Sequence, residues 1–581
     1  MPKGFNDLTC RDDVGGLPRF ERRCRIDFCR SDGRTVAVFE CDGLLENSMY
    51  PARCVAVLLL SLLFANVACP SESASSGTDN DRDAAFSKAL VHAPDAVYQG
   101  TVDSGFSVFK GIPYAQPPVG DLRWKPPVPA EKNTAVVDAT RYGPASAQNA
   151  LAGDVLDIAA PKDQSEDCLH LNVWSPAHAA NASLPVMVWI HGGWFARGSS
   201  RQYPSGVLAK KGNVVVVTLD YRLGPFGFLA HPRLTAESPD HSSGNDGLRD
   251  QIAALQWVRR NIQAFGGDPD RVTIFGQSAG GYSVCYLLAS PLTKGLFRAA
   301  IMQSGTCELR GPQPARRAEQ LGIRLSNTVQ CEDTRDVLAC LRQKSTAEIL
   351  AALPSSATLR SPVNYRPNQD GEVLPGSARQ LIIDGAGKNI PVMIGSTIDD
   401  ASRFVPSTST REEWADYVRK RWPKLADTIL ALYPADTDAD AHAVAVRAAT
   451  EMVFGCSALA TAKAIAGNGT PVYLYLFTYV PERGRRLKIG AFHAAELPYV
   501  FGNLNQTNSP GYGPDDVRLS DALIAIWSRF AATGDPNGPG LPAWPRYVPT
   551  ADTIQEIGLE QQHVANPEAR DCSALQRLGL Q

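Results

Sequence analysis

Six apolar runs along the chain predict buried β-strands. They are residues 185–190, 214–219, 272–275, 299–302, 391–394 and 472–477. Each run is a continuous stretch of apolar, often β-branched residues rather than an alternation of apolar and polar ones. Such continuity is typical of central parallel strands that are covered by helices on both faces. The runs therefore predict the core of a mostly parallel sheet.

The segments between these runs carry apolar residues at helical spacing. In residues 248–265 an apolar side chain recurs every three or four positions, and Gly266-Gly267 supplies a stop. Strands that alternate with helices predict an α/β sheet with right-handed crossovers. Ligands bind beyond the carboxyl ends of the strands in such a sheet, so residues that directly follow a strand are candidates for function.

Residues 1–84 differ from the rest of the chain. An apolar run over residues 55–65 is too short to span a bilayer comfortably but suits the core of a signal peptide. Because this signal begins near Met49, we expect translation to start there. Residues 1–48 are then an extension that is not part of the native product, and residues 49–69 are the signal peptide. A buried internal strand or helix is the alternative.

The segment after the signal predicts where the folded protein begins. Residues 70–84 are rich in Ser, Asp and Gly and predict a flexible tether. Neither a repeat nor a later linker is visible, so residues 85–581 are expected to form one large domain. Export makes the protein secreted or periplasmic. Val67-Ala68-Cys69 partly resembles a lipoprotein box, and lipid anchoring at Cys69 is the less favoured alternative.

The net charge and the cysteine pattern indicate which partners, disulfides and metal sites to expect. With 57 basic and 60 acidic residues the net charge is −3, which gives no indication of a nucleic-acid partner. No stable membrane span is expected. Among thirteen cysteines, Cys331 and Cys340 flank a short segment and suit a disulfide in an oxidising compartment. Neither a Cys-x-x-Cys pair nor a His-Glu-x-x-His motif occurs, so no metal or cofactor is expected.

The pentapeptide Gly276-Gln277-Ser278-Ala279-Gly280 predicts a serine nucleophile on a turn between a strand and a helix. Residues 271–275 before it are β-branched and aromatic, and the residues after it suit a helix that packs on that strand. The two flanking glycines leave room for a strained turn that exposes the hydroxyl group. Such a pentapeptide also arises by chance, so its interpretation depends on the other parts of a hydrolytic site.

A serine hydroxyl needs a base to take its proton, and the base needs a third group to hold it. In α/β-hydrolases these follow in the order Ser, Asp or Glu, His. Of the nine histidines, three follow residue 400. His442 lies at a solvated helix start and His563 in a polar C-terminal segment. His493 lies among small residues after the last long strand, which favours it as the base.

Two further segments complete the candidate site. Asp399 and Asp400 follow the strand at 391–394, and the residue pattern alone leaves open which of them orients the base. Gly192 and Gly193 follow the strand at 185–190, where two consecutive glycines let backbone N–H groups approach a reacting carbonyl. Together with the N–H of Ala279 they form a candidate oxyanion hole.

These motifs together resemble the type-B carboxylesterase/lipase family, which also contains the cholinesterases. The resemblance runs from about Tyr98 to Pro549. Supporting segments are residues 109–115, 166–174, 221–224, 265–269 and 533–537. The resemblance implies an α/β-hydrolase fold, with a mostly parallel central sheet covered by helices on both faces. It also implies an esterase that acts through an acyl-enzyme on a small-molecule ester.

The resemblance assigns roles to the candidate residues. Ser278 becomes the nucleophile, His493 the general base, and Gly192, Gly193 and Ala279 the oxyanion hole. The acid of the family is usually Glu, and its position matches Asp400, one methylene shorter. Ser304 matches a serine that supports the acid.

The resemblance also bears on disulfides and on substrate. Cys331–Cys340 matches a disulfide of the family and is predicted to form. Ser146 replaces the cysteine that would pair with Cys168, so Cys168 is predicted to be unpaired. Arg403 stands where cholinesterases carry an aromatic residue of the choline site, and a guanidinium repels a quaternary ammonium. Choline esters are therefore disfavoured, and neutral esters are expected.

The leading hypothesis is a secreted serine carboxylesterase. One alternative is a true lipase with a lid near residues 153–163. A second alternative is a binding protein without catalysis, because the family includes adhesion proteins that keep the fold but lose activity. The presence of both Ser278 and His493 disfavours the second alternative.

Overall fold

A computed structural model describes residues 24–31, 34–41, 88–149, 161–177, 179, 182–307, 311–354, 363–406, 410–504 and 511–579. Contacts divide the chain into two units, Met1–Arg82 and Asp83–Gln581. In the first unit, β1 (Cys24–Ser31) pairs antiparallel with β2 (Arg34–Cys41). The predicted signal peptide and tether lie outside the described residues, as does most of the segment proposed as a lid.

The second unit is built on one mixed sheet. Its strand order is β19-β18-β17-β16-β13-β12-β10-β11-β9-β5-β4-β3, and β6 pairs with β4. From β11 through β10, β12, β13, β16 and β17 to β18 all neighbours are parallel. Beyond β11 the strands β9, β5, β4 and β3 continue antiparallel, as does β19 beyond β18, whereas β6 pairs parallel with β4. The sheet is therefore parallel at its centre and antiparallel toward both edges.

All six predicted runs form central strands. Their bounds are β10 (Leu184–Ile190), β11 (Val215–Leu219), β12 (Gly267–Gln277), β13 (Ala299–Gln303), β16 (Val392–Thr397) and β17 (Val472–Phe477). The outer strands are β3 (Lys88–His92), β4 (Val97–Asp103), β5 (Phe106–Pro113), β6 (Val136–Asp138), β9 (His170–Pro176), β18 (Thr553–Ile557) and β19 (Gln561–Ala565). Two short pairs lie apart from the sheet, β7 (Ala145–Ser146) with β8 (Gln164–Ser165) and β14 (Gln313–Pro314) with β15 (Asn368–Gln369).

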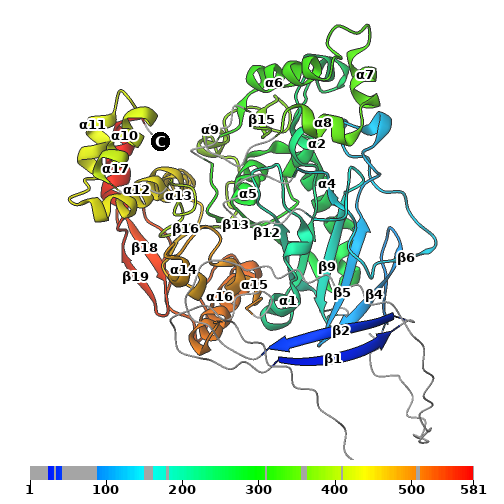
Figure 1. Ribbon diagram of the computed structural model, residues 1–581, viewed down its shortest axis with the longest axis horizontal. Coiled ribbons are helices and arrows are strands. Elements are labelled where there is room, and N and C mark those ends of the chain that lie inside the picture. Colours follow the sequence, from blue (N-terminus) through cyan, green and yellow to red (C-terminus); the bar gives the residue numbers. More distant parts are fainter. Residues whose placement is uncertain are drawn as a thin grey trace, which may run out of the picture. The chain divides into compact units, whose positions relative to one another are not determined.

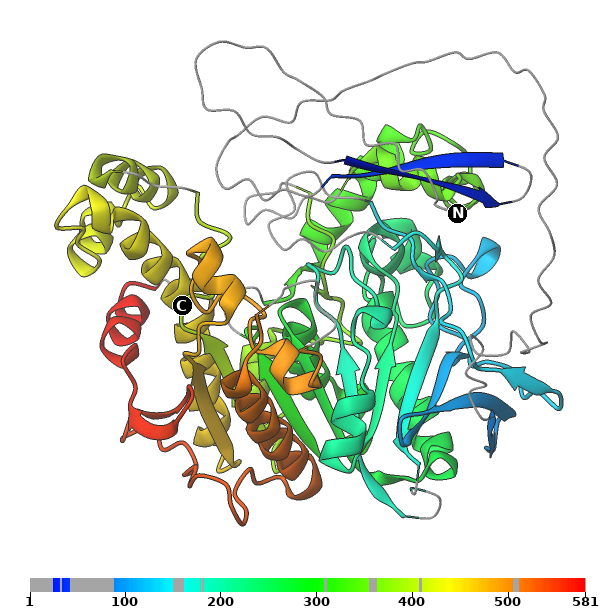
Figure 2. The same cartoon turned by 60° about the horizontal axis from the view of Figure 1, so that its bottom comes forward.

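Helices cover both faces of the sheet (Figure 1, Figure 2). One face packs against α1 (Gly206–Gly212), α15 (Leu497–Phe501) and α16 (Pro514–Thr533). The other packs against α4 (Asp246–Asn261), α5 (Ala279–Ala289) and α13 (Cys456–Gly467). The remaining helices are α2 (Gly224–Phe228), α3 (Pro232–Glu237), α6 (Ala315–Thr328), α7 (Val337–Gln343), α8 (Thr346–Ala352), α9 (Ala378–Ile383), α10 (Arg411–Arg421), α11 (Ala426–Leu432), α12 (Ala441–Thr450), α14 (Glu482–Leu487) and α17 (Ala569–Arg577). This arrangement confirms the predicted fold class.

The packing follows the sequence pattern. The predicted helix over residues 248–265 is α4 and its 3₁₀ continuation Ile262–Phe265, and Gly266 ends it with φ 84°. On the opposite face Trp527 of α16 and Trp189 of β10 are fully buried in a second apolar cluster. Two apolar layers therefore enclose the sheet, as its continuous apolar strands require.

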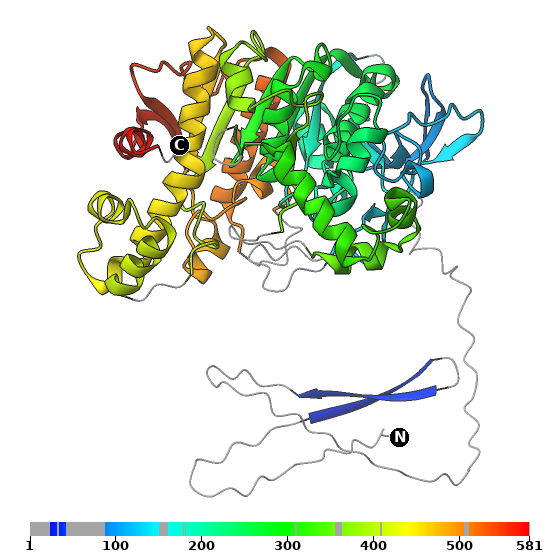
Figure 3. The same cartoon turned by 90° about the horizontal axis from the view of Figure 1, so that it is seen from above.

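The longest run of helix crosses one side of this unit. The helices α12 and α13 are joined by a π-helical turn, Glu451–Gly455, and run on as one long helix (Figure 3). By length and composition the run Asp438–Gly467 could cross a membrane, but 72% of its apolar window is buried inside the protein. An apolar helix that packs inside a soluble core has the same composition.

Within the part of the chain that the structure describes, three cysteine pairs lie at disulfide distance. The Cys331–Cys340 pair, with an S–S distance of 1.98 Å, is the predicted one, and Cys285–Cys307 (1.90 Å) and Cys456–Cys572 (2.00 Å) are two that the sequence analysis missed. Such pairs are consistent with an extracellular protein.

Cys168 is buried and unpaired, as expected from the serine at position 146. The Ser146 hydroxyl hydrogen-bonds with the Cys168 thiol and accepts a bond of 3.1 Å from the Leu223 N–H. These hydrogen bonds therefore link the segments that a disulfide between positions 146 and 168 would have joined.

The C-terminal helix α17 brings a buried carboxylate against the π-helical turn. The Glu568 side chain abuts Gly455, where an added Cβ would lie 2.2 Å from a carboxylate oxygen. Burial, and then the negative charges of Glu451 and Asp400, raise the pKa of Glu568 to about 8. Burial also raises the pKa of Glu451 to about 7, although the Tyr433 hydroxyl donates a 2.7 Å bond to it.

This packing predicts a stability that depends on pH. The ordinary pKa of Glu568 is 4.5 and its folded value about 8. The folded protein therefore binds more protons than the unfolded one between these values, and stability is lost as pH rises through this window. We expect Glu568→Gln to be more stable than wild type at pH 9 by about 2–4 kcal/mol, and close to it at pH 5. Urea unfolding at both pH values measures this, with the exposed Glu560→Gln as control. A difference between Glu568→Gln and wild type that does not change with pH contradicts the prediction.

Candidate active site

Ser278 lies on a sharp turn between β12 and α5. Its backbone has φ 57° and ψ −123°, a strained conformation that is rare for a residue with a side chain. The turn fits because the flanking residues are small: an added Cβ at Gly280 would lie 2.0 Å from the Ile190 carbonyl oxygen. The predicted turn is therefore present, and Ser278 stands at the N-terminus of α5, where the helix dipole favours negative charge.

His493 lies on the loop that leads into α15, and the structure brings it to Asp400. The imidazole Nδ1 hydrogen-bonds with Asp400 Oδ1, and both side chains are buried. Asp400 is held in turn by the Thr397 N–H, which donates a 3.0 Å bond to Oδ2. The carboxylate therefore fixes both the tautomer and the direction of the ring.

Asp399 has a different partner. Its carboxylate accepts a 2.8 Å hydrogen bond from the Ala491 N–H and abuts Gly490, where an added Cβ would lie 2.0 Å away. Burial raises its pKa above the ordinary value. The two adjacent aspartates thus point to different places: Asp400 contacts the imidazole, whereas Asp399 holds the loop that carries it.

The other edge of the imidazole faces the nucleophile turn. With Nδ1–H on Asp400, the Nε2 lone pair accepts a bond of 3.0 Å from the Gln277 side-chain amide. The ring also packs between Phe404 and Phe454, each with a centroid distance of 5.1 Å. Sequence reasoning missed these three contacts, although Gln277 is next to the serine in the pentapeptide.

The predicted oxyanion loop begins where β10 ends. An added Cβ at Gly192 would lie 3.1 Å from Ser278 Cβ, so the two backbones are in close approach. Gly193 has φ 111°, and Trp194 and Phe195 follow with φ 63° and 60°. A residue other than glycine at position 193 is excluded by this φ and by the Arg197 carbonyl oxygen, 2.2 Å from an added Cβ.

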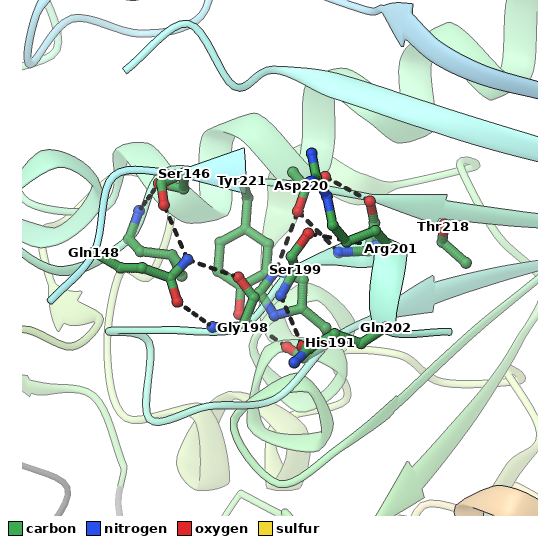
Figure 4. A network of polar contacts seen from close by, with 12 residues as sticks. Ser146, Gln148, His191, Gly198, Ser199, Arg201, Gln202, Thr218, Asp220 and Tyr221 are labelled. Atoms are coloured by element: carbon green, nitrogen blue, oxygen red, sulfur yellow. Dashed lines mark hydrogen bonds and ion pairs between the residues drawn. The ribbon is translucent and has the colours of Figure 1, made fainter. Parts of the chain in front are cut away.

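A buried polar network supports this loop from behind (Figure 4). The Gln148 amide bonds both backbone groups of Gly198: its Nε2 donates to the carbonyl and its Oε1 accepts from the N–H, each at 2.9 Å. His191 Nδ1 donates to the Gly192 carbonyl at 2.8 Å, and the Tyr221 hydroxyl donates to the His191 carbonyl at 2.9 Å. Both ends of the loop 191–198 are therefore anchored.

The same network reaches the sheet. Asp220, directly after β11, accepts bonds from both the N–H and the hydroxyl of Ser200, at 2.9 and 2.5 Å. Burial lowers the pKa of His191, although Asp220 raises it in part. The His191 ring is thus kept neutral, stacked 4.5 Å from the Tyr221 ring.

Ser304 and Glu496 lie deeper than the imidazole. The Ser304 backbone N–H donates to the Gly395 carbonyl at 2.8 Å, but its hydroxyl has no hydrogen-bond partner among the described residues. Glu496 accepts a 2.9 Å bond from the Gln303 amide, and its pKa is raised to about 7, mainly by burial and also by the charge of Asp400. The structure therefore does not bring the Ser304 hydroxyl into a bond with Asp400.

Two cavities meet at Ser278 and His493. The first holds about 490 Å³ of empty space, open solvent included, and its wall is mostly aromatic and aliphatic. Trp194, Phe195, Tyr282, Phe404, Val453 and Phe454 line it together with Asn364, Ala279 and Arg366. The second holds about 840 Å³ of empty space, open solvent included, and its wall is more polar. Gly192 and Gly193 are among the residues that line it. A molecule bound at Ser278 can therefore extend in two directions with different surroundings.

Comparison with known proteins agrees with this geometry. The sequence profile of the Carboxylesterase family matches residues 91–575. The chain is similar to the para-nitrobenzyl esterase of Bacillus subtilis (strain 168), with 39% identity over 489 residues that cover 80% of this chain and 94% of that protein. It is also similar to the fumonisin B1 esterase of Sphingopyxis macrogoltabida, with 36% identity over 475 residues that cover 79% and 85%.

The likeness extends to three dimensions. A solved structure of PNB esterase matches with a TM-score of 0.71 and 36% sequence identity, covering 85% of this chain and 99% of that one. A thermophilic PNB esterase matches with a TM-score of 0.72 and 35% identity, covering 84% and 99%. This chain therefore belongs to the carboxylesterase family, the serine hydrolases that cleave carboxylic esters.

Proposed function

We propose that Ser278, His493 and Asp400 form the catalytic triad of this carboxylesterase. The observation that carries the proposal is the orientation of the imidazole: Nδ1 bonds the buried Asp400 carboxylate, and Nε2 faces the turn that carries Ser278. With a carboxylate behind it, the ring can take a proton at Nε2 and remain stabilised as the cation.

Acylation uses these groups in sequence. His493 Nε2 takes the Ser278 proton as the hydroxyl attacks the ester carbonyl, and the Gln277 amide gives up its bond to Nε2 during this step. The negative oxygen of the tetrahedral intermediate accepts hydrogen bonds from the N–H groups of Gly192, Gly193 and Ala279, each worth about 3–4 kcal/mol. His493 then protonates the leaving alcohol, which leaves an acyl group on Ser278.

Deacylation repeats these steps with water. The imidazole takes a proton from a water molecule that attacks the acyl-enzyme, and the same N–H groups hold the second oxyanion. Gly192 is held against the nucleophile turn, and Gln148 and Tyr221 fix the loop that carries it. The donors are thus preorganised, which is the main source of catalysis at such a site.

Replacement of the nucleophile tests this proposal. We expect Ser278→Ala to lower kcat for a short-chain 4-nitrophenyl ester by at least about 10⁴-fold, because the acyl-enzyme can no longer form. The melting temperature should be unchanged, and a fluorophosphonate probe should label wild type but not the variant. A residual activity within about tenfold of wild type, a barrier change of about 1.4 kcal/mol, contradicts the assignment.

A matched pair of variants tests the acid. We expect Asp400→Asn to lower kcat by about 10³–10⁴-fold, because the amide favours the wrong tautomer of His493. Asp399→Asn makes the same chemical change one residue away, on the side chain that bonds the Ala491 N–H. It should retain activity within about tenfold of wild type. The reverse order of the two losses would assign the acid to Asp399 instead.

We also propose that the protein is exported by a signal peptide that begins near Met49. The apolar run at 55–65 and the three cysteine pairs at disulfide distance support export. Amino-terminal sequencing of the protein purified from its native source should give a first residue between positions 66 and 84. A mature chain that retains residues before Met49 contradicts the proposal.

A further inference from the structure

The second cavity beside the nucleophile carries two positive charges. Arg403 and Arg483 both line it, together with Ser278 and His493. Arg403 comes from the turn after β16, three residues beyond the acid, and Arg483 from α14. Two segments distant in the sequence thus bring guanidinium groups to one cavity. No carboxylate is present among the described residues that line it.

Both arginines are partly enclosed by the protein. Each side chain is half-buried, and the Arg483 guanidinium lies 5.8 Å from the centroid of the Phe492 ring, which lines the same cavity. Tyr203, Leu497 and Tyr512 contribute further to the wall. A cavity with partly apolar walls has a lower effective dielectric than bulk water, so the two charges act more strongly there on a bound group.

The first cavity differs in character but not in the sign of its charge. Its wall is largely aromatic, and Arg366 is its one charged residue apart from His493 among the described lining residues. Every fixed charge that these residues bring to the two cavities is therefore positive. These charges repel a cationic substrate and attract an anionic one.

We propose that the enzyme acts on esters that carry a carboxylate, with this carboxylate bound by Arg403 and Arg483 in the second cavity and an apolar part of the molecule in the first. This inference rests on the proposed function and adds the substrate class. A guanidinium has five N–H donors in a planar fork that matches a carboxylate. Two guanidinium groups in one cavity therefore suit a carboxylate as ligand.

The test compares esters of matched size that carry either a carboxylate or a neutral primary amide at the same position. 4-Nitrophenyl hydrogen adipate carries the carboxylate on the acyl side, and its partner carries a primary amide in its place. 4-Acetoxybenzoate carries it on the alcohol side, and 4-acetoxybenzamide is its partner. We expect kcat/KM for the charged member of at least one pair to exceed that for the neutral member by about tenfold or more. The pair with the larger ratio shows which side of the ester occupies the second cavity.

Variants assign this selectivity to the two arginines. Arg403→Gln and Arg483→Gln should each lower the charged-to-neutral ratio several-fold, and the double variant should bring it close to one. Arg486→Gln, an exposed arginine of the same helix, should leave the ratio at its wild-type value. Each ratio is measured on one preparation, so it does not depend on the fraction of protein that folds. Raising NaCl from 50 to 500 mM should also lower the ratio in wild type.

Two results overturn the inference. One is a ratio near one for both ester pairs in wild type, with neutral esters still cleaved in a Ser278-dependent manner. The other is a high ratio that survives in the double variant. Both differ from failure of the proposed function, in which Ser278→Ala retains hydrolysis of the neutral esters.

Discussion

The close approach of the nucleophile turn to strand β10 is the constraint on which the site depends. Only glycine, whose side chain is a hydrogen atom, fits at position 280, because an added Cβ would lie 2.0 Å from the Ile190 carbonyl oxygen. Ile190 is the last residue of β10, and the glycine loop starts directly after it. The same contact that forces Ser278 into a strained conformation therefore also sets its distance to the oxyanion loop. Such strain costs about 1–3 kcal/mol and persists only because the surrounding packing fixes it.

The parallel centre of the sheet then assembles the remaining groups. β10, β12, β13 and β16 are neighbours, and at their carboxyl ends lie the glycine loop, Ser278, Ser304 and Asp400. His493 comes from the segment after β17, the next strand along the sheet. Residues that are distant in the sequence thus meet at one edge without long loops. The proposed catalytic groups thus follow strands of the parallel centre, beyond whose carboxyl ends ligands bind in such sheets.

The sequence predicted those parts of the structure that are marked by a pattern within a short stretch of residues. Continuous apolar runs revealed the central strands, and the pentapeptide revealed the turn at Ser278. Several outer strands were missed because they are only partly buried: β19, for example, has intermediate and exposed positions only. The strand β9 was missed although all its residues but the first are buried. The Cys456–Cys572 pair spans 116 residues and depends on the docking of α17, which no local pattern encodes.

The choice between Asp399 and Asp400 could not be made from the residue pattern, because adjacent side chains point in different directions only once the turn after β16 is defined. The Asp399 carboxylate accepts a hydrogen bond from the Ala491 N–H, whereas the Asp400 carboxylate contacts the imidazole of His493. The same limit applies to Gln277, Phe404 and Phe454. Their contact with the His493 ring arises from the meeting of three separate segments.

Charge is distributed unequally around the imidazole, and this distribution links the triad to the cavities. Behind the ring lie Asp400 and, deeper, Glu496 and Glu568. Burial raises the pKa of these two glutamates to about 7 and about 8, so neither is fully ionised at neutral pH. In front of it lie Arg403 and Arg483. In the proposed mechanism His493 becomes positively charged beside a cavity that already carries two guanidinium groups. A substrate carboxylate bound by the two arginines, as proposed, would balance part of this positive charge. Substrate charge would then affect the proton transfer at Nε2 as well as binding, so that a neutral ester loses in kcat and not only in KM.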